Sequence, residues 1–86
     1  MDERDYERLA KSIDPLVRIG KNGISDSFVD ELIKVLKKHH LVKIKVLKAA
    51  SFSGREEIER VAYDLAKRTE SKVISIIGRT FTLYHK

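Results

Sequence analysis

The sequence predicts an α/β fold of the two-layer α+β type, with the element order αβαβαββ and a mixed four-stranded sheet beside three helices. Three segments repeat apolar residues every three to four positions, and four shorter ones alternate apolar with polar residues. The two kinds of segment alternate along the chain, as in strand–helix–strand crossovers. With 86 residues, 42% of them hydrophobic, residues 1–86 are expected to form one domain around one core.

The first predicted helix ends at Asp14, because Pro15 disfavours helical geometry in the residue before it. A short strand is expected at Leu16–Ile19, just before a loop with two glycines. The apolar stripe of this helix comprises Tyr6, Leu9, Ala10 and Ile13.

The second predicted helix spans Asp26–His39, and Ser25 or Asp26 is suited to cap its N-terminus. The next segment, Leu41–Leu47, is predicted to be a strand, because its apolar residues alternate with Lys43 and Lys45. The buried stripe of the helix is expected to comprise Val29, Leu32, Ile33 and Leu36.

The third predicted helix opens with a capping-box pattern made by Ser53 and Glu56, and it ends near Glu70. Its apolar residues recur at the helical spacing, which indicates one buried face. That stripe comprises Ile58, Val61, Ala62 and Leu65.

The last two predicted strands, Lys72–Ile77 and Thr80–His85, flank the pair Gly78-Arg79. A two-residue connection with glycine first suits a tight hairpin turn. The hairpin is therefore expected to add one antiparallel strand, whereas the two strand–helix–strand crossovers predict parallel pairing with right-handed connections.

Alternation along the strands divides the predicted sheet into two faces. One face is apolar and is expected to meet the crossover helices, whereas the other is polar and basic at its centre. The apolar face is expected to contain Val17, Ile19, Val42, Ile44, Val46, Ile74, Ile76, Phe81 and Leu83. The second face is expected to contain Arg18, Lys43, Lys45, Ser75, Thr80, Thr82 and Tyr84. The first helix is expected to cover part of it, over Leu16, Leu41, Leu47, Val73 and Ile77.

The net charge of +5 is distributed unevenly along the chain. The predicted strand-and-loop stretches 15–23, 41–54 and 72–86 carry +2, +3 and +3. The predicted helical stretches 1–14, 24–40 and 55–71 carry −2, 0 and −1. Because the excess follows one class of element, it predicts a basic surface made by strands and loops, and a polyanion as its partner.

The most informative motif is the loop Gly20-Lys21-Asn22-Gly23 between the first strand and the second helix. A glycine at each end lets the backbone take positive φ, so that neighbouring amide groups turn inward together. With the first N–H groups of the following helix, these amides make a site suited to a phosphate. The alternative is that Asn-Gly is simply a favourable turn dipeptide.

The cations outside the predicted helices extend this candidate site: Arg18, Lys21, Lys43, Lys45, Lys48 and Arg79. Lys43 and Lys45 have an alternative role as solvated residues of an exposed strand, and Arg79 as a turn residue. Phe52 lies in a polar loop, where an aromatic side chain either stacks on an unpaired base or packs over the start of the third helix.

Catalysis, metal binding and membrane insertion are not expected. The glycine loop lacks P-loop spacing, and no sequence pattern indicates a nucleophilic triad or a catalytic carboxylate pair. His39 and His40 are adjacent, so on a helix they point about 100° apart and cannot chelate together. We therefore predict no enzyme activity, cofactor, small-molecule substrate or membrane partner. The absence of cysteine and the charged N-terminal residues 1–5 fit a cytoplasmic location.

Three blocks of the sequence resemble the CRM domain family, named for chloroplast RNA splicing and ribosome maturation. The blocks are Val17–Gly23, Leu41–Val46 and Ile77–Tyr84, in the same order as in the family. The resemblance implies a fold similar to the C-terminal domain of bacterial translation initiation factor three, and RNA binding through the glycine loop as in KH domains. It also implies that stand-alone members associate with precursor large ribosomal subunits, whereas plant members act in group II intron splicing.

Carried over to this chain, the resemblance assigns the backbone clamp to Gly20, Lys21, Asn22 and Gly23, and it matches Arg79 to a second signature. Two features depart from the family pattern. The first helix is rich in acidic residues where the family is typically basic, and His85 stands where arginine is common.

The sequence thus predicts a non-catalytic RNA-binding protein that docks on structured ribosomal RNA as an assembly or maturation factor. Loop amides would hold the sugar–phosphate backbone, Lys21 would add charge, and Arg18, Lys43, Lys45 and Arg79 would extend the contact surface. Such contacts position the RNA, so that specificity comes from its shape. The alternatives are an Alba-like chromatin protein that binds duplex DNA, and a protein-interaction adaptor that uses the second helix.

Overall fold

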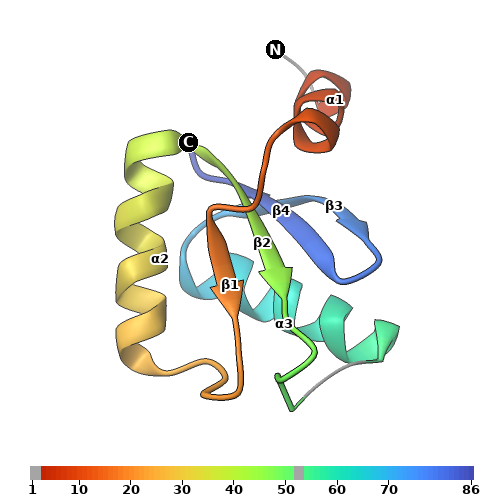
Figure 1. The fold of residues 1–86 in the computed structure, drawn as a ribbon. Coiled ribbons are helices and arrows are strands. Elements are labelled where there is room, and N and C mark those ends of the chain that lie inside the picture. The colour runs from red at the N-terminus through yellow and green to blue at the C-terminus, as the bar shows by residue number, and fades with distance from the viewer. Residues whose placement is uncertain (1–2, 52–53) are drawn as a thin grey trace.

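The computed structural model describes residues 3–51 and 54–86 and has the predicted element order, αβαβαββ (Figure 1). Most element boundaries fall within one or two residues of those predicted. Among the helices of the described residues, none is both long and apolar enough to cross a bilayer. The elements are α1 (Glu3–Ser12), β1 (Val17–Ile19), α2 (Asp26–His39), β2 (Leu41–Val46), α3 (Arg55–Arg68), β3 (Lys72–Ile77) and β4 (Thr80–Tyr84).

The four strands form one mixed sheet in the order β1-β2-β4-β3. β1 and β2 are parallel, as predicted, and β4 is antiparallel to both of its neighbours. The predicted parallel pairing across the second crossover is wrong, because β4 lies between β2 and β3. Core side chains of the two central strands, among them Ile44 of β2 and Phe81 of β4, are completely buried.

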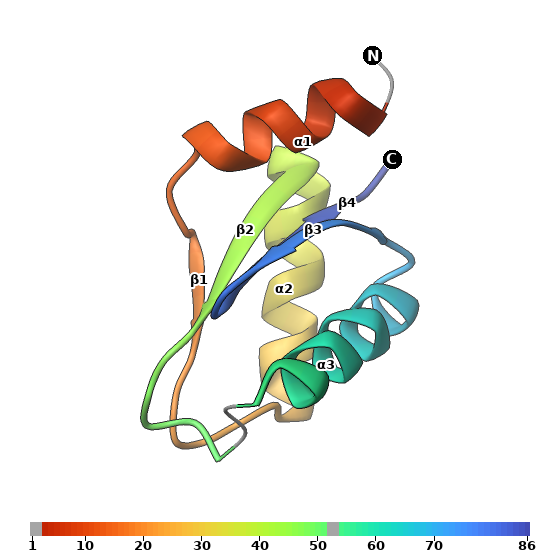
Figure 2. The same ribbon diagram turned by 90° about the vertical axis from the view of Figure 1, so that its right-hand side faces the viewer.

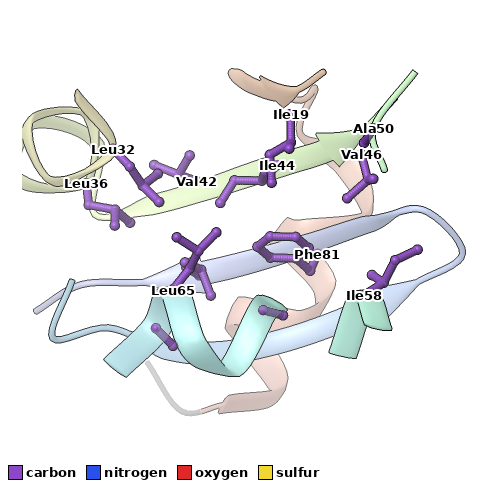
Figure 3. Close-up of a cluster of buried hydrophobic side chains, with 13 residues drawn as sticks. Ile19, Leu32, Leu36, Val42, Ile44, Val46, Ala50, Ile58, Leu65 and Phe81 are labelled. Carbon is purple, nitrogen blue, oxygen red and sulfur yellow. The ribbon is translucent and has the colours of Figure 1, made fainter. Parts of the chain in front are cut away.

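The main core lies between the sheet and the helices α2 and α3, which cover one face (Figure 2). Figure 3 shows Phe81 near the centre of this core, between Leu65 and Ile58 of α3. Side chains of β2 and α2 complete the cluster, among them Ile44 and Leu32. The predicted apolar face of the sheet is thus largely confirmed.

The two core helices begin in different ways. Ser25 caps α2, and its Oγ accepts a hydrogen bond from the backbone N–H of Phe28 at 3.1 Å, as the sequence predicts. The N-cap of α3 is Gly54, which provides no side-chain hydrogen bond. The predicted capping box is therefore not how α3 begins, and Ser53 itself lies outside the described residues.

A β-bulge in β3 changes which side chains face the main core. The register shifts between Val73 and Ser75, so that Val73 pairs with Leu83 and packs against the core cluster. Ile74 is also buried, but it lies outside that cluster. The predicted faces of Val73 and Ile74 are therefore exchanged, because a bulge inserts one extra residue and breaks the alternation of a strand.

Helix α1 packs on the second face of the sheet, against β2 and β3. Ala10 is buried there, and the Nζ of Lys43 donates a hydrogen bond to its backbone carbonyl at 3.1 Å. This carbonyl belongs to the last turn of α1, where the helix leaves acceptors without partners. Lys43 therefore caps the C-terminal end of α1 with a positive charge, which also suits the helix dipole.

An aromatic pair holds the other half of α1 to the sheet. The rings of Tyr6 and Tyr84 stack with their centroids 4.3 Å apart. A hydrogen bond to Tyr84 is the main cause that raises the pKa of the Tyr6 hydroxyl, and partial desolvation and the charge of Asp5 act in the same direction. The first helix covers part of the second face, as predicted, but Leu16 and Ile77, which were expected beneath it, are each 53% exposed, and Val73 faces the main core.

Replacement of Lys43 by methionine tests the role of this lysine in attaching α1. Lys43→Met keeps an apolar stem but removes the donor to Ala10, so we expect a loss of about 1–2 kcal/mol in the free energy of unfolding. Lys45→Met is the matched control, because Lys45 is exposed on the same strand. Urea unfolding measures the stability, and amide hydrogen exchange should show faster opening of α1 in Lys43→Met only. Equal stability of the two variants would contradict this role.

Candidate nucleic-acid interface

One end of the sheet gathers the segments that the sequence singles out. The C-terminal ends of β1 and β2 meet there because the two strands are parallel, and the Gly20–Gly23 loop follows β1 at this end (Figure 2). The β3–β4 turn reaches the same end, since β4 starts beside the end of β2. The loop, the turn and the segment after β2 therefore form one continuous rim.

The Gly20–Gly23 loop is a tight turn in which the N–H of Gly23 donates to the carbonyl of Gly20 at 3.0 Å. Gly23 has a φ of 65°, a conformation that favours glycine. Gly20 does not have a positive φ, so the expectation that both glycines need this freedom is wrong for Gly20. A Cβ on Gly20 would meet Leu47 Cδ1 at 3.8 Å, which is an ordinary contact.

The tip of the loop has two backbone N–H groups without a described partner. Lys21 and Asn22 are exposed, and among the described residues no hydrogen-bond partner takes up their backbone N–H groups. The turn uses only the N–H of Gly23, which it needs for its own geometry. Two neighbouring donors and one lysine are therefore available to an anionic group.

An open hollow of about 490 Å³ lies beside the loop. Arg18 of β1 forms part of its wall, and Phe28 at the start of α2 contributes half-buried aromatic surface. Sequence reasoning missed the contribution of α2. A signal for it exists, because Ser27 and Glu31 are four residues apart and share the helix face next to the loop. The α2 residues that line the hollow are Ser25, Ser27, Phe28 and Glu31.

Arg18 and Lys45 are neighbours on the second face of the sheet. They occupy paired positions on the parallel strands β1 and β2, so their side chains leave the sheet on the same side. Both are exposed, and Lys45 lies two residues beyond Lys43, where α1 packs. Lys48 is exposed in the segment after β2. The rim thus carries a group of accessible cations: Arg18, Lys21, Lys45 and Lys48.

The other two predicted cations are used inside the molecule. Lys43 donates to the carbonyl of Ala10, as described above. Arg79 donates from Nε to the carbonyl of Val46 at 3.0 Å and from Nη2 to that of Leu47 at 2.7 Å. The structure therefore groups the loop with Arg18 and Lys45 but gives Lys43 and Arg79 intramolecular partners. Phe52 lies outside the described residues.

At the opposite end of the molecule, His40 and His85 make hydrogen bonds that involve the C-terminal segment. The Nδ1 of His40 lies 3.0 Å from the carbonyl of His85, and the Nδ1 of His85 lies 3.2 Å from the carbonyl of Glu70. These contacts hold the C-terminal segment against the ends of α2 and α3. No group of three or more metal-binding side chains suited to an ion occurs in the part of the chain that the structure describes.

The model of the CRS1/YhbY (CRM) domain family matches residues 2–85, so the chain belongs to the CRM domain family. This confirms the resemblance seen in the three sequence blocks. The matched residues include the Gly20–Gly23 loop, the α2 residues that line the hollow, and Arg79.

The relatives and a solved structure agree with the family. The chain is 36% identical over 75 residues to MJ0652 of Methanocaldococcus jannaschii, covering 87% of this chain and 54% of that protein. It is 29% identical over 75 residues to YqeI of Bacillus subtilis, covering 87% of this chain and 74% of YqeI. Both relatives are named as probable RNA-binding proteins, and this chain spans about half the length of the first.

The solution structure of the hypothetical protein SAV1595 from Staphylococcus aureus has the same fold, with a TM-score of 0.82 and 27% sequence identity. The similarity covers 98% of this chain and 83% of that chain. SAV1595 is described as a candidate RNA-binding protein. The predicted arrangement of three helices and a mixed four-stranded sheet is confirmed by this similarity and by the structure itself.

Replacement of Arg79 tests whether its guanidinium stabilises this rim. Arg79→Lys keeps the charge, but one ammonium does not reproduce the planar fork that reaches two carbonyls. We expect a loss of about 1–2 kcal/mol in the free energy of unfolding, measured in urea. Arg55→Lys is the control, because the contact that Arg55 makes among the described residues is an exposed ion pair with Glu59, and this variant should change stability little. A similar small effect at both positions would show that Arg79 does not stabilise the rim.

Proposed function

We propose that this chain is a non-catalytic RNA-binding protein that docks on structured ribosomal RNA and acts in the assembly or maturation of the large ribosomal subunit. The observation that carries the proposal is the exposed Gly20–Gly23 turn, whose two tip amides are without intramolecular partners among the described residues. Membership of the CRM family and the names of its relatives support RNA as the partner. A cytoplasmic location is part of this proposal.

The loop is proposed to hold the sugar–phosphate backbone as the corresponding loop of KH domains does. The amides of Lys21 and Asn22 donate to phosphate oxygens, and the Lys21 ammonium adds charge. Arg18 and Lys45 continue the contact over the open part of the sheet's second face. These cations contact phosphates, so they position the RNA but do not recognise its sequence.

Lys43 and Arg79 have a supporting role in this proposal. Each uses its charged group to bind backbone carbonyls within the protein, and each is partly buried. Contact with RNA by either residue would have to use the part of its charged group that remains accessible. Their main contribution is therefore to fix the surfaces from which Arg18, Lys21 and Lys45 project.

A double substitution in the loop tests the proposed contact. Lys21→Asp with Asn22→Asp leaves the turn hydrogen bond between Gly23 and Gly20 in place, so the protein should fold normally. We expect its affinity for a fluorescein-labelled RNA stem–loop at physiological salt to fall at least tenfold, on the order of 1.4 kcal/mol. Fluorescence anisotropy measures the affinity, and circular dichroism verifies the fold.

The matched control changes the net charge by the same amount on the exposed face of α2. Lys34→Glu with Lys38→Gln alters two exposed lysines away from the loop, and it should weaken binding much less than the loop variant. Unchanged affinity of a folded loop variant would move the binding site elsewhere. Tighter binding of duplex DNA than of the RNA stem–loop at the same salt concentration would favour the DNA-binding alternative.

Crosslinking in cells tests the proposed ribosomal partner. Ultraviolet crosslinking of the full chain, followed by sequencing of the attached RNA, should recover precursor RNA of the large ribosomal subunit. The loop variant should recover much less of it, while the α2 control recovers similar amounts. Recovery of mainly non-ribosomal RNA would contradict the assembly role but leave RNA binding through the loop intact.

A further inference from the structure

The hollow beside the Gly20–Gly23 loop contains a carboxylate. Glu31 is exposed on α2 and lines the hollow together with Arg18 and Lys21. A surface that binds only phosphates gains from cations, and an acidic side chain within a Debye length weakens such binding. A phosphate clamp therefore does not explain Glu31, whereas a ligand that also donates hydrogen bonds does.

Glu31 and Arg18 are not neutralised by each other. Within the described residues, side-chain ion pairs join Arg55 to Glu59 and Arg68 to Asp64, and neither Arg18 nor Glu31 takes part in one. The Glu31 carboxylate is therefore available as an acceptor to whatever enters the hollow. A carboxylate accepts through two oxygens, and a guanidinium donates through a planar fork.

The size and lining of the hollow suit a flat heterocycle. Its volume of about 490 Å³ lies within the range of about 300–1,000 Å³ found for small-ligand clefts. Phe28 contributes half-buried aromatic surface, and the loop amides at the tip lie on the same rim. An unpaired base of a bound RNA strand can therefore enter the hollow while its backbone lies on the loop.

Resting on the proposed RNA-binding function, we propose that the hollow receives one unpaired base and prefers guanine. The N1–H and N2–H donors of guanine suit the two carboxylate oxygens of Glu31. Uracil places carbonyl oxygens on both sides of its single N–H, so it meets the Glu31 carboxylate with less hydrogen bonding and more repulsion.

The test compares three stem–loop RNAs whose uridine loops differ at one central nucleotide. That nucleotide is guanosine, inosine or uridine, and inosine lacks only the 2-amino group of guanosine. We expect the wild-type chain to bind the guanosine RNA about fivefold or more tightly than the uridine RNA, with the inosine RNA between them. Fluorescence anisotropy at fixed salt measures all three affinities.

Glu31→Gln should bring the affinities for the guanosine and inosine RNAs to within about twofold of each other, because it removes one acceptor oxygen and the charge. Asp30→Asn is the matched control, because it makes the same change in charge at the neighbouring exposed residue of α2, which does not line the hollow. The control should keep the wild-type order of affinities.

Equal binding of the three RNAs by the wild-type chain would overturn the guanine preference. An unchanged guanosine-to-inosine ratio in Glu31→Gln would overturn the role of Glu31. Both results are distinct from failure of the proposed function, in which the loop double variant binds every RNA as tightly as the wild-type chain.

Discussion

The backbone carbonyls at the end of β2 accept the Arg79 guanidinium, and the position of the candidate interface depends on this junction. Val46 donates its N–H back to the Arg79 carbonyl at 2.7 Å, and the N–H of Leu47 donates to the carbonyl of Ile19 at 2.9 Å. The β3–β4 turn, the end of β2 and the end of β1 are therefore joined through consecutive residues. The Gly20–Gly23 loop starts at the end of β1. Its base is therefore fixed by three segments, although its tip is open to solvent.

The second face of the sheet shows how similar cations acquire different roles. Lys43 and Lys45 point to this face from alternate positions of β2, yet only Lys43 lies where α1 packs. Because α1 leaves unpaired carbonyls at its C-terminal end, the lysine beneath it becomes a cap. Lys45 lies beyond the helix, next to Arg18 in the register, and remains exposed. The extent of α1 therefore divides this face into an internal half and an accessible half.

Local signals allowed much of the fold to be predicted from the sequence, and long-range contacts account for the rest. The bounds of α2 follow from a cap at Ser25 and an apolar stripe, both of which act within a few residues. The insertion of β4 between β2 and β3 depends on how much apolar surface each strand buries at the centre of the sheet. The sequence of a single segment does not show this. The intramolecular bonds of Lys43 and Arg79 also join residues that are 32 or 33 positions apart. In the candidate site, the loop was marked by its glycines, whereas Glu31 was hidden among the solvated charges of a helix.

Stabilisation of the fold and the proposed ligand contact therefore depend on different residues. Arg79 and Lys43 direct their charges toward the protein's own carbonyls, where they stabilise the fold. Lys21 and Asn22 are exposed and make no side-chain hydrogen bond or ion pair among the described residues, so the loop tip contributes little to stability. Because the tip contributes little to stability, the nearby carboxylate of Glu31 does not disturb the fold. In the proposed complex, its repulsion of phosphate lowers the affinity for RNA, and a base that donates hydrogen bonds to the carboxylate offsets that loss.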